Sequence, residues 1–145
     1  KEEQTDEAKD VSKENTLSFS ITAQNEVMLN DKPVAVEDIR RRIVDFVRMR
    51  GAQHLILVDA NPASDYNTYF TLENEIVAAY AEVRNAEAKR RYHRDYASCT
   101  DEQRKKVRDI YPQHLSETYN TAEVNNSTED NKTSKAVDEK KGGAE

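Results

Sequence analysis

A run of basic side chains is the most reactive-looking feature of the sequence, in the stretch "EAKRRYHRDYASCTDEQRKKVRD". Guanidinium and ammonium groups at this density can bind anionic glycans, lipid headgroups or an acidic protein. The cationic and aromatic side chains of this run include Arg90, Arg91, Tyr92, Arg94, Lys105 and Lys106. Acidic side chains alternate with them, namely Glu87, Asp95, Asp101, Glu102 and Asp109. The alternation favours a solvated helix surface over an anion-binding site.

The remaining candidates for chemistry are one cysteine and three histidines. Cys99 precedes Thr100 at a predicted helix N-terminus, where a thiol pKa can be lowered, but no base stands beside it in the sequence. A loop cysteine is therefore favoured over a nucleophile, with a small hydrolase or redox protein as the alternative. His54, His93 and His114 lack a carboxylate or cysteine at ligand spacing. We predict no enzymatic activity, no cofactor and no metal.

Composition divides the 145 residues into a central body and two polar ends. Residues 1–16 and 118–145 are charged and contain few large apolar side chains, so we expect both to be disordered. Residues 17–117 contain 15 Lys and Arg against 16 Asp and Glu, so the net charge of −6 comes mostly from the ends. A nearly neutral body disfavours nucleic acid as a partner.

Two short strands open the body. In "LSFSITA", Leu17, Phe19 and Ile21 alternate with polar residues, which is typical of a half-buried strand. "QNE" is a turn and "VMLN" the returning strand, so the pattern predicts a hairpin. "NDKP" then interrupts the chain, because Asn30 and Asp31 favour turns and Pro33 cannot donate to a sheet.

Three helices and further strands follow. An apolar stripe from Val36 to Val47 predicts a first helix that Gly51 ends, and "HLILVDA" predicts a central strand. Ser64 or Asp65 is the expected N-cap of a long second helix whose later half we expect to project from the body or lie on its edge. "TDEQRKKVRDIYP" has a capping-box pattern and predicts a third helix. "QHLSE" is a candidate last strand.

The expected fold is therefore α+β, with helices on one face of a small sheet and the order β-β-α-β-α-α-(β). Either of the strands around Leu17–Thr22 and His54–Asp59 is a candidate sheet edge, to which an extended peptide or a second copy of the chain could add.

Three stretches between Leu17 and Val83 resemble the periplasmic domain of the ExbD/TolR biopolymer-transport family. "ITAQNEVMLNDKPVAVEDIRRRI" is similar to the family's hairpin and first helix. "HLILVDANPASDY" resembles its next segment, with Asp59 and Tyr66 at the matching positions. "NTYFTLENEIVAAYAEV" takes the place of its second helix. The family's Gly-containing turn before the last strand is missing, and the helical C-terminal third looks like an elaboration.

The resemblance implies a non-enzymatic subunit of a proton-driven complex that powers TonB-dependent transport. It implies an ExbB/TolQ-like membrane subunit and a TonB-like protein as partners, and a homodimer in the complex. It also implies a periplasmic domain of a bacterial inner-membrane protein, whose single N-terminal membrane helix, with the proton-carrying aspartate, would precede residues 1–16. The alternatives are a TolR-like domain that binds peptidoglycan and a soluble interaction module.

We expect partner contacts on the two candidate edge strands and beside the loop that follows the second. The residues concerned are Leu17, Phe19, Ile21, Leu55, Leu57, Asp59 and Tyr66. For the last two residues a structural role is the competing interpretation, in which Asp59 accepts hydrogen bonds from the "ANPASD" loop and Tyr66 packs over it.

Overall fold

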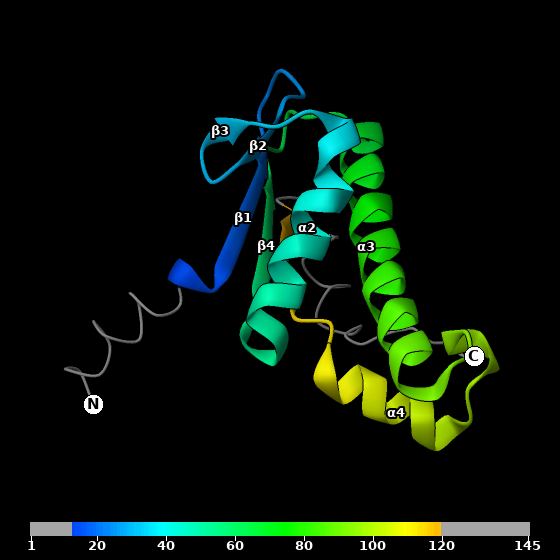
Figure 1. Cartoon of the computed structure of the whole chain (residues 1–145). Coiled ribbons are helices and arrows are strands. Elements are labelled where there is room, and N and C mark those ends of the chain that lie inside the picture. Colours follow the sequence, from blue (N-terminus) through cyan, green and yellow to red (C-terminus); the bar gives the residue numbers. More distant parts are fainter. Residues whose placement is uncertain (1–12, 120–145) are drawn as a thin grey trace.

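The computed structural model describes residues 13–119, so most of the two predicted disordered ends lies outside the described residues (Figure 1). The described part contains one five-stranded sheet with the order β3-β2-β1-β4-β5. Its strands are β1 (Thr16–Ile21), β2 (Val27–Leu29), β3 (Lys32–Pro33), β4 (Leu55–Ala60) and β5 (Leu115–Tyr119). β1, β4 and β5 run parallel, while β2 is antiparallel to β1 and to β3.

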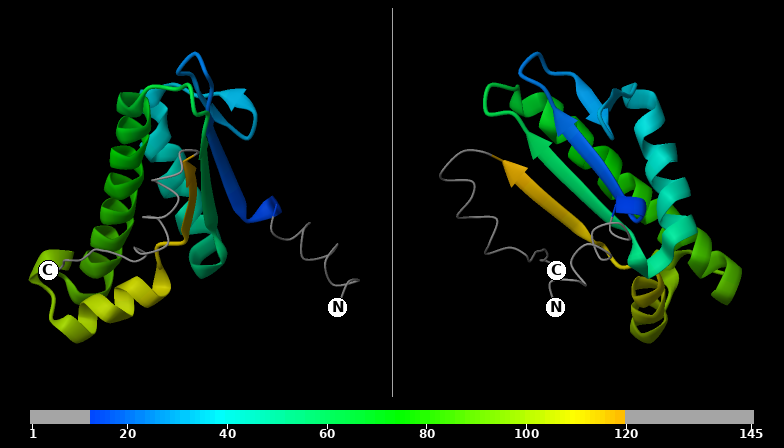
Figure 2. Two further views of the ribbon diagram at one scale, coloured as in Figure 1. Left: turned by 180° about the vertical axis from the view of Figure 1, so that it is seen from behind. Right: turned by 90° about the vertical axis from the view of Figure 1, so that its left-hand side faces the viewer.

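Three α-helices accompany the sheet: α2 (Val36–Arg50), α3 (Tyr66–Tyr92) and α4 (Asp101–Ile110). Two short 3₁₀ helices, η1 (Gly51–Gln53) and η2 (Tyr96–Ser98), join them to the rest. Figure 2 shows α2 and α3 on the same face of the sheet, which confirms the predicted α+β fold. Within residues 13–119, no helix is both long and apolar enough to cross a membrane.

The hairpin region contains one strand more than the sequence predicts. Lys32 and Pro33 form β3, paired with β2, although Pro33 was expected to interrupt the chain. β3 is the outermost strand, where a residue without an N–H is tolerated. Asn30 and Asp31 have positive φ angles of 51° and 71° and make the tight turn that precedes it. The Asn30 side chain accepts a hydrogen bond from the backbone N–H of Ser18 at 3.0 Å.

Helix ends follow the local signals in the sequence. Gly51, with φ of 62°, ends α2. The Asp65 carboxylate accepts a hydrogen bond from the N–H of Asn67 at the start of α3. Thr100 and Gln103 form the predicted capping box of α4. These interactions satisfy backbone groups that a helix end leaves without an intrahelical partner.

The main core lies between the sheet and the two helices α2 and α3. Each of the long strands contributes alternate side chains, and each of the helices contributes one stripe. Its most deeply buried members include Phe19, Ile39, Ile43, Ile56, Leu72 and Ile76. Burial of this apolar surface is the dominant stabilising term for such a two-layer arrangement.

A second, smaller core lies where α3 extends past the sheet. Ala88, Cys99 and Val107 are buried there, and Tyr92 and Tyr96 pack against them. We name residues 84–112 the helical extension. The later half of α3 was expected to project or to lie on an edge, and in the structure η2 and α4 fold back against it.

Candidate functional site

The strand order changes which edges can accept a partner. β1 pairs with β2 and β4, and β4 pairs with β1 and β5, so both strands lie inside the sheet. The expectation that the strand around Leu17–Thr22 or the one around His54–Asp59 forms an edge is therefore wrong. The outer strands of the described sheet are β3 and β5. β3 is only two residues long, so β5 is the longer strand edge without a neighbouring strand among residues 13–119.

Three of the predicted contact residues belong to the core. Leu17, Phe19 and Ile21 are 5%, 1% and 2% exposed, and their side chains face the helices. A partner cannot reach these side chains in the folded domain. The alternation of apolar and polar residues in β1 identified these three residues as one face of a strand. That face is the buried one, because the helices cover this side of the sheet.

The predicted residues of β4 and the following loop are more accessible. Leu55 and Leu57 are partly buried on the sheet face opposite the helices, and Asp59 on the same face is exposed. In the loop after β4, the Asn61 side chain accepts the hydrogen bond from the N–H of Ala63 at 2.8 Å. Tyr66 is 56% exposed and stacks on Phe70, with ring centroids 6.1 Å apart.

Tyr66 leads to an exposed apolar stripe on α3. Phe70 and Val77 are 50% and 57% exposed, on a helix whose opposite side is buried in the core. Phe70, Val77 and Arg84 are seven residues apart, so they share one helix face. The Arg84 guanidinium donates a hydrogen bond to the carbonyl of Tyr111 at 3.0 Å, just before β5. The stripe therefore lies on the side of α3 that faces β5.

β5 and this stripe together form what we call the edge surface, defined by Leu115–Tyr119, Tyr66, Phe70 and Val77. In the right-hand view of Figure 2, β5 (orange) is the outermost strand on its side of the sheet, and α3 (green) lies behind the sheet. α3 returns from β4 and so runs antiparallel to β5. The edge surface thus combines an outer strand of the described sheet with three exposed, largely apolar side chains of α3.

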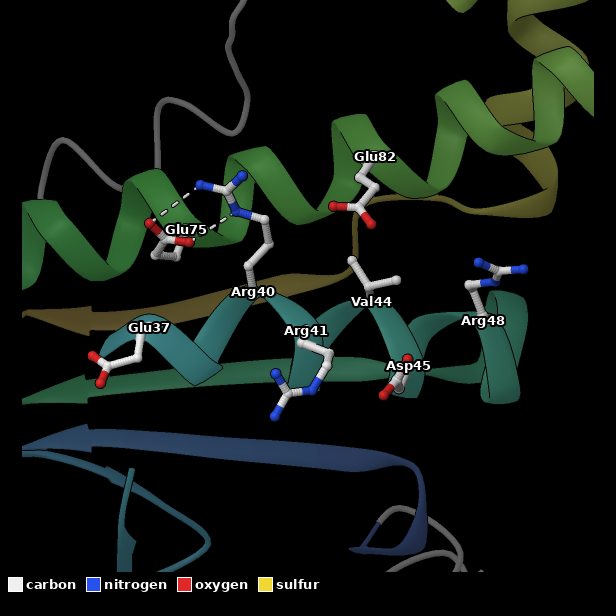
Figure 3. A pocket seen from close by; sticks show the side chains of 8 residues that line it. All are labelled: Glu37, Arg40, Arg41, Val44, Asp45, Arg48, Glu75 and Glu82. Carbon is white, nitrogen blue, oxygen red and sulfur yellow. Dashed lines mark hydrogen bonds and ion pairs between the residues drawn. The ribbon is translucent and has the colours of Figure 1, made fainter. Parts of the chain in front are cut away.

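A pocket of about 450 Å³ lies between α2 and α3, on the other side of α3 (Figure 3). The Arg40 side chain crosses the pocket and forms an ion pair with Glu75, in which Arg40 Nε lies 2.9 Å from Glu75 Oε1. Its lining is almost entirely charged and of both signs: Glu37, Arg40, Arg41, Asp45, Arg48, Glu75 and Glu82, beside Val44. Four carboxylates and three guanidinium groups are mixed here, so the lining does not present a surface of one charge to a ligand.

The basic run of the sequence lies in the helical extension, where most of its charges have partners. Arg90 and Arg91 both bind Glu87, at 2.6 Å and 3.1 Å. The hydrogen bond from Arg90 is the main reason why the pKa of Glu87 is lowered, and the bond from Arg91 adds to it. Lys105 binds Asp109 at 3.0 Å. The structure shows the predicted solvated helix surface and adds these ion pairs to it.

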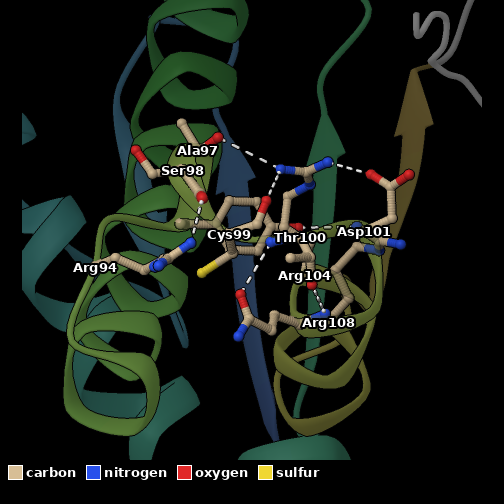
Figure 4. A network of polar contacts seen from close by, with 10 residues as sticks. Arg94, Ala97, Ser98, Cys99, Thr100, Asp101, Arg104 and Arg108 are labelled. Atoms are coloured by element: carbon tan, nitrogen blue, oxygen red, sulfur yellow. Dashed lines mark hydrogen bonds and ion pairs between the residues drawn. The ribbon is translucent and has the colours of Figure 1, made fainter.

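Cys99 is buried within this polar network (Figure 4). Arg104 donates hydrogen bonds to the carbonyls of Ala97 and Cys99 and binds Asp101. The thiol belongs to the small core of the extension, so a nucleophilic role has no accessible sulfur to act through. Among residues 13–119, no group of three or more His, Cys, Asp or Glu side chains is arranged to hold a metal ion.

Of the seven predicted contact residues, the edge surface contains only Tyr66. The sequence reasoning missed Phe70, Val77 and the edge position of β5. A usable signal was present, since Phe70 and Val77 lie seven residues apart on one face of the second helix, away from the predicted stripe of Tyr69, Leu72, Ile76, Tyr80 and Val83. A search of known protein families and a search of curated proteins both found no match to this chain. The resemblance of Leu17 to Val83 to the ExbD/TolR family therefore remains a prediction.

Proposed function

We propose that this chain is a non-enzymatic binding domain that captures an extended segment of a partner protein by adding it as a strand to β5. The edge surface carries the proposal, because it places an open strand edge beside exposed Phe70 and Val77. Backbone hydrogen bonds to a sheet edge supply affinity without regard to sequence, and alternate side chains of the added strand supply specificity.

The two faces of such an added strand would meet different surroundings. On the helix side, alternate side chains reach Tyr66, Phe70 and Val77, so apolar residues fit there. On the opposite face they lie next to Ser116 and Thr118, which are exposed on β5. The preferred segment is therefore extended, with apolar and polar residues in alternation.

The biological setting that we propose is the one implied by the family resemblance. In that setting the domain is the periplasmic part of an ExbD-like subunit, and the captured segment is the linker of a TonB-like protein. The proposal is supported by the hairpin, first helix and following strand, which form where the sequence predicted them. The Asn30-Asp31 turn of the "LND" segment adopts the left-handed conformation that its residue types favour.

The test is an NMR titration of the ¹⁵N-labelled chain with overlapping peptides from the linker of a TonB-like protein. We expect chemical-shift changes in β5 and at Tyr66, Phe70 and Val77, and much smaller changes in α2. Phe70→Glu should abolish binding, because it places a charge in the apolar stripe. Met49→Glu is the matched control, since Met49 is a 72% exposed apolar side chain on α2. Shifts confined to other elements, or equal loss in both variants, would contradict the proposal.

A further inference from the structure

A buried histidine lies at the end of the sheet where β4 and β5 begin. The side chain of His54 is almost fully buried, at 1% exposed. Its Nδ1 lies 2.6 Å from the carbonyl oxygen of Gly51, and its Nε2 lies 2.5 Å from the hydroxyl of Tyr80. A carbonyl can only accept, so Nδ1 carries a proton. In neutral His54, Nε2 then accepts the hydrogen bond from Tyr80, and both ring nitrogens are satisfied.

The same group of side chains holds the residue that precedes β5. The His114 ring stacks on the His54 ring with centroids 5.4 Å apart, and its Nδ1 donates to the carbonyl of His54 at 3.1 Å. The carbonyl of His114 accepts the first bond from β4, from the N–H of Ile56 at 2.9 Å. The backbone of His114 also hydrogen-bonds to the Tyr80 hydroxyl. We name His54, Tyr80 and His114 the histidine cluster.

The surroundings of His54 oppose a positive charge. The titratable and charged groups that face it are Tyr80 and Arg84 from α3 and His114 from the segment before β5, and no carboxylate of the described residues is among them. Burial is the main cause that lowers the pKa of His54, and the nearby His114 and Arg84 lower it further. The hydrogen bond to Gly51 acts in the opposite direction but does not outweigh them.

Protonation would also disturb the hydrogen bonds of the cluster. With protons on both nitrogens, His54 must donate to the Tyr80 oxygen, which already accepts from the backbone of His114. The Tyr80 hydroxyl then needs a new acceptor for its own proton. A buried donor without an acceptor is costly, so the packed arrangement is less stable with His54 charged.

We infer that the histidine cluster is a pH-sensitive switch that holds the start of β5 in place while His54 is neutral and releases it when His54 takes up a proton. His54 is the proton acceptor, Tyr80 and Gly51 fix its neutral tautomer, and stacking and backbone bonds transmit its state to His114. Release of β5 would remove the open edge of the edge surface. This consequence for partner capture rests on the proposed function, whereas the switch itself does not.

The direction of the pH dependence follows from the lowered pKa of His54. The unfolded chain binds this proton more readily than the folded one, so stability is complete above the unfolded pKa of about 6.5. It falls as the pH drops from there towards the folded pKa. One proton is involved, so the equilibrium for opening β5 changes by at most about tenfold per pH unit within that window.

The experiment uses the whole chain without a partner. Histidine ring NMR signals give the pKa of His54, and amide exchange at pH 7.5 and pH 5.0, corrected for intrinsic rates, gives the protection of β5 and α2. We expect protection to fall in β5 on acidification and to change much less in α2. A His54 pKa at or above 6.5, or equal protection of β5 at both pH values, would overturn the inference.

Three variants separate the switch from general loss of stability. His54→Gln cannot titrate but can still accept from Tyr80, so the pH dependence of β5 should disappear. Tyr80→Phe removes the bond that favours neutral His54, so it should raise the pKa of His54 and move the opening of β5 to higher pH. His93→Asn is the control, because His93 is an exposed histidine whose left-handed conformation asparagine tolerates. Opening that is unchanged in His54→Gln would refute the switch.

Peptide titrations at both pH values distinguish this failure from that of the proposed function. If β5 opens on acidification but no linker peptide binds at pH 7.5, the switch stands and peptide capture fails. If peptides bind equally at both pH values and β5 stays protected, the switch fails and peptide capture stands. If binding weakens at pH 5.0 in the natural chain but not in His54→Gln, both stand.

Discussion

In the main body, seventeen buried apolar side chains fill the space between the sheet and two helices, whereas the helical extension buries three apolar residues, Ala88, Cys99 and Val107, and the charged Glu87. In place of a large apolar core, the extension has hydrogen bonds between groups that are close to each other in the sequence. Arg104 binds two carbonyls of the segment before α4. The backbone N–H of Tyr96 donates to the Asn85 side chain at 2.8 Å.

The difference indicates two levels of stability within one chain. Apolar burial in the body involves residues far apart in the sequence, so its loss should unfold the sheet as a whole. Most hydrogen bonds and ion pairs of the extension join neighbouring segments, and Tyr111 is its residue that packs against the main core, so we expect the extension to open while the body stays folded. Local opening of this kind is expected where few apolar contacts are made.

The largest effect should come from truncating the main core. Phe19→Ala removes a side chain that is 1% exposed and leaves a cavity under the helices. We expect a loss of about 3–5 kcal/mol in the free energy of unfolding, measured by urea denaturation followed by circular dichroism. Ser18→Ala on the exposed face of β1 is the control and should change stability by about 0.5 kcal/mol or less. Similar values for the two variants would mean that Phe19 is not a core residue.

A smaller, local effect should come from removing the cap of α4. Thr100→Ala breaks the bond from the N–H of Gln103 to the threonine hydroxyl, which is 3.1 Å long. We expect a loss of about 1 kcal/mol, seen as faster amide exchange in α4 with little change in α2. Thr100→Ser keeps the hydroxyl and should restore most of the protection. Equal acceleration in α2 would show that body and extension unfold together and would end the distinction between them.

The elements predicted correctly are those whose signals are local. The stop at Gly51, the cap at Asp65 and the capping box at Thr100 each depend on residues a few positions apart, and all three occur in the structure. The helices were visible as apolar stripes because their core-facing sides are buried along most of their length. The fold class followed from the order of these elements.

What the sequence did not reveal depends on contacts between distant segments. Whether β4 is an edge is decided by β5, which follows more than fifty residues later in the chain, after α3 and α4. The contacts of His54 depend on the folded arrangement, because His54 precedes β4, Tyr80 lies in α3 and His114 precedes β5. No rule of sequence spacing connects these residues, so the sequence analysis treated His54 and His114 as isolated histidines.

The smallest effect in this comparison should appear in acid, within the extension. The pKa of Glu87 is lowered, first by its bond to Arg90, so its interaction is complete above the ordinary value of 4.5 and is lost as the pH falls below it. Amide exchange around Glu87 and in α4 should accelerate between pH 5.0 and pH 3.0. Glu87→Gln should already exchange faster at pH 5.0 and respond less to further acidification.

Glu82→Gln, an exposed position one turn earlier on α3, is the matched control and should behave like the natural chain. The window for Glu87 lies below the ordinary histidine range in which the effect of His54 begins, and the elements that respond are different, since His54 acts on β5. If Glu87→Gln altered the exchange of β5 rather than that of α4, charge in the extension would be coupled to the sheet. The extension would then be part of the switch at the start of β5 instead of a separate unit beside it.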